Sequence, residues 1–270
     1  MSRSSRKAAH NPLPFIWKQI SIQIRMRAIS IFSLGLLVVQ PAVFSTVGYL
    51  LARLAGKPIP DLVHVIIGGG IMGMWSSIVF TSFFDISNDR REGTLELIVG
   101  SPTSITTVLA VRTFANVLTG MVSMLLSFFV AMVFFQLSVP LRNIPYILIS
   151  LVILCFGFWC IGVFLAHFRV ASRVTGMFIN YLELPVAILA AFMFPIEYLP
   201  RWIVWLSNSI PLRWGVTSLN GSFQAGRPLS GIGIDWLISI GVSLIYLIIT
   251  YLLSRKVHNM IRITGELSSV

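Results

Sequence analysis

Charged residues are scarce in this chain. Only 11% of its 270 residues are Asp, Glu, Lys or Arg, whereas 56% are hydrophobic, and only nine residues are acidic. So little polar surface cannot cover a soluble globule of this length, which excludes a soluble enzyme or binding module. Cysteine is also rare: Cys155 and Cys160 stand five apart, so on a helix they diverge by about 140° and predict neither a disulfide nor a metal clip.

The motifs of intrinsic catalysis are missing as well. No Gly-x-x-x-x-Gly-Lys-Ser/Thr loop occurs, and the triplet Gly68-Gly69-Gly70 lies in an apolar run without a following lysine. No Ser-His-Asp or paired-carboxylate pattern is present, and the four histidines lack the spacing of zinc ligands. We therefore expect no catalytic residue, no metal site and no cofactor bound by this chain.

Long apolar runs dominate the rest of the sequence. A helix needs about 20 apolar residues to cross the hydrocarbon core, where lipid offers the backbone no hydrogen-bond partner. Six segments qualify, at residues 29–52, 62–84, 106–137, 144–168, 174–194 and 232–253. The sequence predicts an all-α membrane protein made of a single transmembrane domain of six helices.

The basic residues predict how these helices are oriented. Six spans place both termini on one side of the membrane, and that side carries fourteen of the twenty Lys and Arg residues. Because cytoplasmic loops retain Lys and Arg, both termini are expected in the cytoplasm. The net charge of +11 then follows from topology and anionic headgroups, and does not require a nucleic-acid partner.

The chain divides simply along this plan. Residues 1–28 form a cytoplasmic segment that we expect to lie along the membrane as an amphipathic helix, with Trp17 at headgroup depth. Its periodicity is ambiguous, because residues 20–27 alternate as a strand would. The remaining parts are spans 1–2 (29–84), a charged segment (85–105), spans 3–5 (106–194), an outer segment (195–231), span 6 (232–253) and a cytoplasmic tail (254–270).

The charged segment 85–105 is the most informative stretch. It holds four of the nine acids and separates two apolar runs. Asp89 and Glu92 stand three residues apart, as in a box that begins a helix, where carboxylates meet free backbone amides. Gly100, Ser101 and Pro102 then predict its end. The segment is read either as a docking site for a partner or as a solvated turn that holds topology.

Here the sequence resembles the membrane subunits of type 2 ABC transporters, which are mostly prokaryotic exporters with six spans. The run Arg91-Glu92-Gly93-Thr94-Leu95-Glu96-Leu97, with Ser101-Pro102, is similar to the coupling helix of that family. A second match, Met193-Phe194-Pro195-Ile196-Glu197 and the tryptophans after it, is similar to the short re-entrant outer helices between spans 5 and 6.

The resemblance implies partners and site residues. It implies a pair of permease subunits, identical or homologous, which enclose a pathway and bind two copies of a separate ATP-binding subunit that carries ATP and Mg. It further implies a prokaryotic plasma membrane and export of a substrate that the sequence does not identify. The residues expected to couple to the ATPase are Asp89, Arg90, Arg91, Glu92, Gly93, Thr94, Leu95 and Glu96, with Trp17 and Lys18 as a second contact.

Glu183 is the one ionisable residue well inside a predicted span. A carboxylate there is costly and normally pairs, protonates or faces water. With Asn180 and Pro185, which loosens the helix beside it, Glu183 is a candidate pathway or gating residue. The alternative is a buried acid satisfied by its neighbours.

Other functions stay open on the same residues. A stand-alone secondary transporter or channel would use Glu183 without an ATPase, and a non-transporting anchor would only recruit a partner. Gly69-x-x-x-Gly73 permits close helix packing, either within the chain or at a subunit interface. Trp202, Trp205 and Trp214 predict an outer aromatic belt or a substrate exit.

Overall fold

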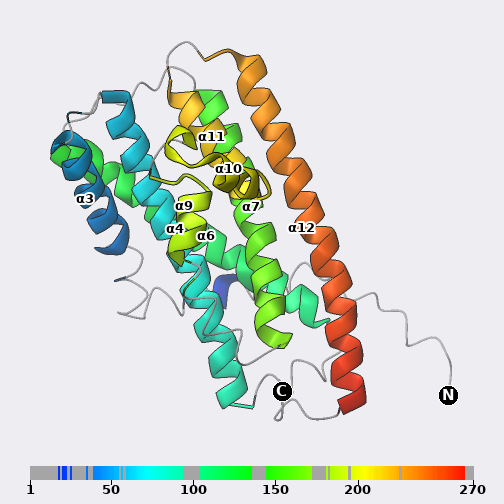
Figure 1. Ribbon diagram of the computed structural model, residues 1–270. Helices are drawn as coiled ribbons and strands as arrows, with labels where there is room; N and C mark the ends of the chain where they lie inside the picture. The colour runs from blue at the N-terminus through cyan, green and yellow to red at the C-terminus, as the bar shows by residue number, and fades with distance from the viewer. Residues whose placement is uncertain are drawn as a thin grey trace.

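The computed structural model describes residues 18, 20–22, 25, 35, 39–54, 56, 59–93, 104–135, 144–171, 181, 183–193, 196–224 and 227–264. Within these ranges every regular element is a helix (Figure 1). The prediction of an all-α protein is confirmed for this part of the chain.

Four long helices contain apolar stretches long enough to cross a membrane. They are α4 (Ile59–Arg91), α6 (Ile105–Phe135), α7 (Ile144–Ala171) and α12 (Leu229–Thr264). The stretches coincide with the second, third, fourth and sixth predicted spans, at Val63–Phe80, Ile105–Phe129, Ile144–Val170 and Leu229–Arg255. Within the first predicted span the structure describes α3 (Gln40–Leu54), a shorter apolar helix, and little of the span before it. The described residues thus contain four candidate spans, and the number six stays a prediction.

The fifth predicted span, residues 174–194, does not continue as one helix to its end. Its described part is α9 (Glu183–Leu189), followed by a turn in which the Phe192 N–H donates to the Ala187 carbonyl over 3.1 Å. Ala191 in this turn has a φ of 54°, a conformation that costs a non-glycine residue energy. The turn buries Phe192 completely, so packing ends the helix before residue 194, where the predicted span ends.

Short helices follow this turn, before α12. They are η4 (Ile196–Tyr198), α10 (Arg201–Asn208) and α11 (Pro211–Phe223). Pro211 fits the first position of α11 because that position needs no backbone N–H donor. Most of α11 is buried, and it packs against α7 and α12. Figure 1 shows α10 and α11 toward the end of the bundle where α12 begins.

The helix α4 is the central helix of the fold. In its apolar stretch 83% of the residues are buried inside the chain, compared with 17% for α12. It contacts α3, α6, α7, α9 and α11. Any displacement of α4 therefore has to be accommodated by most of the described helices.

Glycines on α4 make this close packing possible. A side chain at Gly69 would overlap Ser45 of α3, and one at Gly73 would overlap Pro41 of α3. Gly70 also lies close to α6, where an added Cβ would stand 3.1 Å from Met124 Cγ. The Gly69-x-x-x-Gly73 face is thus occupied by α3 of the same chain, so its alternative use at a subunit interface is wrong.

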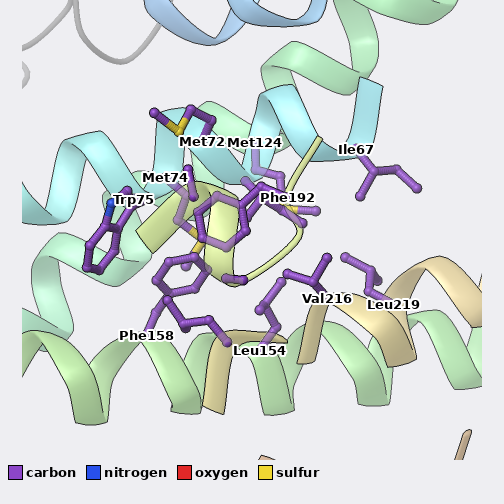
Figure 2. Close-up of a cluster of buried hydrophobic side chains, with 14 of the residues drawn as sticks. Ile67, Met72, Met74, Trp75, Met124, Leu154, Phe158, Phe192, Val216 and Leu219 are labelled. Atoms are coloured by element: carbon purple, nitrogen blue, oxygen red, sulfur yellow. The ribbon is translucent and has the colours of Figure 1, made fainter. Parts of the chain in front are cut away.

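The apolar core surrounds the middle of α4. Figure 2 shows Trp75, Phe158 and Phe192 gathered from α4, α7 and the turn after α9, with Leu154 and Val216 beside them. The ring centroids of Trp75 and Phe158 lie 6.2 Å apart, and those of Phe158 and Phe192 lie 6.1 Å apart. These contacts fix the turn after α9 against the central helix.

Candidate functional site

Residues 85–91 of the charged segment form the last turns of α4. Asp89, Arg90 and Arg91 belong to α4, and Glu92 and Gly93 form the turn that ends it. Gly93 has a φ of 68°, the left-handed conformation with which glycine commonly stops a helix. The prediction that Asp89 and Glu92 begin a helix is therefore wrong, because the residues from 85 to 91 offer no break and α4 continues through them.

Asp89 pairs with Arg112 of α6. Both side chains are only 16% exposed, and a second contact joins Arg112 Nη2 to Asp89 Oδ1 at 3.5 Å. A carboxylate is unfavourable in the last turn of a helix, where the backbone dipole is negative, so a guanidinium partner stabilises it there. The pair ties the end of α4 to α6.

The first turn of α6 is fixed from two sides at this end of the bundle. Ser104 caps the helix, since its Oγ accepts a hydrogen bond from the Thr107 N–H at 3.2 Å. Thr106 Oγ1 lies 3.2 Å from Nε2 of His167 on α7, and His167 Nδ1 lies 2.8 Å from the Val163 carbonyl oxygen. Sequence reasoning missed these residues, although Ser104 before an apolar run is a typical helix start.

The structure describes only some of the other residues that we expect to couple to the ATPase. Glu92 and Gly93 are exposed, and Lys18 is helical and exposed. Thr94, Leu95, Glu96 and Trp17 lie outside the described residues. Their role in binding a partner stays a prediction.

Glu183 is held against α4. It is the first residue of α9, and its carboxylate accepts a hydrogen bond from the hydroxyl of Ser76. The indole Nε1–H of the neighbouring Trp75 donates to the Glu183 carbonyl oxygen over 3.3 Å. Pro185 follows in α9 with an exposed side chain, and Asn180 lies outside the described residues. The structure thus joins Glu183 to two residues that the sequence had not singled out.

An ion pair at the opposite end of the bundle also escaped the sequence analysis. Arg227 Nη2 lies 2.7 Å from Oδ2 of the buried Asp235 in α12, and its Nη1 donates to the Thr217 carbonyl over 2.9 Å. Burial lowers the pKa of the Arg213 guanidinium nearby, while the Asp235 and Glu197 carboxylates oppose that shift. The group connects α11 to α12.

The three outer tryptophans differ in their exposure. Trp202 and Trp205 on α10 are 74% and 76% exposed. Trp214 on α11 is partly buried, donates its Nε1–H to the Asn208 carbonyl over 3.0 Å, and lies under the Arg213 guanidinium. Trp214 thus contributes contacts within the fold, and the aromatic belt stays a prediction.

One comparison with known proteins gives a match. The family described as ABC-2 family transporter protein matches residues 23–252, which is most of the chain. No curated protein matches it. The match extends from before α3 to the late part of α12.

Proposed function

The chain belongs to the ABC-2 family of transporter proteins, and from this premise we propose that it is the permease subunit of an ATP-driven exporter. The family consists of multi-pass membrane components of ABC transporters, not of ATPases, and normally works with an ATP-binding subunit. In our proposal two permease subunits enclose the pathway, and two separate ATP-binding subunits supply ATP and Mg.

The observation that carries this proposal is the position of α4. The helix that contains the most buried candidate span ends at Arg91. The exposed residues Glu92 and Gly93 follow it, directly before the predicted coupling residues Thr94, Leu95 and Glu96. A partner that binds this segment is therefore connected directly to α4, against which α3, α6, α7, α9 and α11 pack. A merely solvated turn would need no such connection to the core.

The ion pair at this end supports the same role. Because Asp89 is bound to Arg112, a force on the end of α4 acts also on the start of α6. We propose that nucleotide-driven closure of the ATP-binding subunits displaces this end, and that the displacement biases the permease between two states of its pathway. The partner must bind one of these states more tightly than the other, because equal affinity for both would not shift the equilibrium between them.

The membrane arrangement that we propose has six spans. The four candidate spans are completed by one span that includes α3 and one that includes α9, with both termini in the cytoplasm of a prokaryote. α10 and α11 then form the re-entrant outer helices. The excess of Lys and Arg on the side of the termini supports this orientation.

Site-specific photo-crosslinking tests the proposal. A photoreactive amino acid in place of Glu92, which is exposed, is expected to capture a protein that carries a phosphate-binding loop. The matched control carries the same amino acid in place of Arg201, which is also exposed but lies at the start of α10. Crosslinks are identified by mass spectrometry from the native membrane.

The outcome separates the proposal from a stand-alone transporter or channel. Capture of an ATP-binding protein at position 92 and not at position 201 supports it. If position 92 captures no such protein, while the purified chain moves solute without nucleotide, the proposed function is wrong.

A further inference from the structure

Glu183 is bound to α4 through both its side chain and its main chain. The carboxylate accepts from the Ser76 hydroxyl, and the carbonyl oxygen accepts from Trp75 Nε1–H at 3.3 Å. Ser76 and Trp75 are both completely buried. A hydrogen bond in such an apolar setting is stronger than one in water, so the first residue of α9 is fastened to the central helix.

The other end of the α9 segment rests on α4 as well. The carbonyl group of Phe192 lies so close to Gly68 that any side chain at position 68 would overlap it. Phe192 itself is fully buried against Phe158 of α7. Ala191, beside it, keeps its unfavourable φ of 54° in this packed turn. α9 and its turn are therefore held on α4 at two levels, one at Trp75–Ser76 and one at Gly68.

A third contact extends this connection to α10. The hydroxyl of Ser207, near the end of α10, donates to the Leu189 carbonyl at the last residue of α9. Ser207 is completely buried, whereas Trp202 and Trp205 on the same helix are exposed. The buried side of α10 is thus joined to the segment that α4 holds.

These contacts lie far along α4 from its Glu92 end. From Arg91 to Ser76 the helix extends about 22 Å, and from Arg91 to Gly68 about 35 Å, at 1.5 Å per residue. The described helix is continuous over both distances. A displacement at the Glu92 end can therefore reach the α9 segment through one element, without a chain of loops.

We infer that Ser76 and Trp75 are positioning residues that fasten the α9 segment to α4 through Glu183, so that α9 and α10 move with α4 when the ATP-binding subunits act. This inference rests on the proposed function and gives Glu183 a specific part in it. The Glu183 carboxylate accepts a hydrogen bond from Ser76 of α4, and its negative charge has no part in moving the substrate.

Conservative variants separate this role from an ionised pathway residue. Glu183→Gln keeps an oxygen that accepts from Ser76, and Ser76→Thr keeps a hydroxyl that donates. Both are expected to retain the coupling of α10 to nucleotide. Ser76→Ala and Glu183→Leu each remove one partner of this hydrogen bond, and both are expected to weaken the coupling of α10 to nucleotide.

The experiment measures α10 directly, so it needs no known substrate. Cys155 and Cys160 are replaced by alanine, and a single reporter cysteine is placed at position 202, which is exposed. The complex, purified with its ATP-binding subunit in nanodiscs, is labelled with a maleimide, without nucleotide and after trapping with ATP and vanadate. The labelling rate of the reporter and the ATPase rate are recorded for each variant.

We expect nucleotide to change the labelling rate at position 202 when Ser76 is present. In Ser76→Ala this change should shrink by about fivefold, the factor that matches the loss of one hydrogen bond of about 1 kcal/mol, while ATP hydrolysis continues. Ser76→Thr and Glu183→Gln should restore the change. Ser243→Ala is the matched control, because Ser243 is equally buried but donates to the Ser239 carbonyl of its own helix.

Three results overturn the inference, and they are distinguishable. If Ser76→Ala keeps the full response of position 202 during ATP hydrolysis, α9 is not fastened through this contact, and the proposed function stands. If Glu183→Gln abolishes the response as Glu183→Leu does, the charge itself matters. If no ATP-hydrolysing subunit accompanies the chain, the proposed function fails and the inference fails with it.

Discussion

The ion pair between Asp89 and Arg112 gives a prediction whose size follows from the structure. Each side chain is only 16% exposed, so removal of one partner leaves the other charge largely desolvated. Breaking a fully buried pair in this way costs 3–5 kcal/mol, and partial exposure reduces the expected cost to about 2 kcal/mol. We expect Asp89→Ala and Arg112→Ala each to lower the free energy of unfolding by about that amount.

The double variant isolates the interaction itself. With both charges removed, no unpaired charge remains, so Asp89→Ala/Arg112→Ala should cost no more than about 2 kcal/mol, well short of the sum of the single costs. The free energies are measured by unfolding the purified chain with SDS in mixed micelles. Arg201→Ala is the control, because Arg201 is exposed and its loss should cost less than about 0.5 kcal/mol.

Additivity would refute this reasoning. If the double variant is as unstable as the two single variants together, the side chains do not stabilise each other, and α4 is not joined to α6 through them. Single costs no greater than that of Arg201→Ala would lead to the same conclusion.

Three further changes test other parts of the fold. Gly68→Ala should lower the free energy of unfolding in SDS by about 1–3 kcal/mol, because the added methyl group overlaps the Phe192 carbonyl. Gly233→Ala is the control and should be neutral or stabilising, because no atom lies within 4 Å of the added Cβ. Arg227→Ala should cost about 3 kcal/mol, since it leaves the buried Asp235 carboxylate without this partner; a melting temperature equal to wild type would contradict this. Trp202→Phe should remove a large part of the tryptophan fluorescence that brominated lipids quench, if α10 faces lipid; unchanged quenching would place Trp202 away from the bilayer.

Much of the fold follows from apolar length alone. Four predicted spans coincide with candidate membrane-crossing stretches, with ends that differ by at most eight residues, because some 20 consecutive apolar residues leave a chain in lipid few options but a helix. The positions where prediction failed are set by tertiary packing. The helix break near Ala191 carries no glycine or proline, and it arises because Phe192 is buried against α7 and α4.

The candidate site was predictable only in part. Glu92 and Gly93 were identified by resemblance, and the structure places them at the exposed end of α4. The absence of Gly and Pro from residues 85–91 agrees with the continuation of α4, but the pairing of Asp89 with Arg112 was not predictable, because the two residues are distant in sequence. Ser76 likewise gave no signal, since a serine within an apolar run is common and only the fold brings it to Glu183.

The most direct test of the central claim is the ATPase activity of the chain purified from its native membrane together with whatever binds it. The wild-type complex is compared with the Glu92→Ala/Glu96→Ala variant at equal amounts of chain. We predict that an ATP-hydrolysing subunit accompanies the wild-type chain, and that the variant either loses this subunit or no longer stimulates it. A chain that arrives alone, moves solute without nucleotide and is unaffected by the two substitutions would contradict the account.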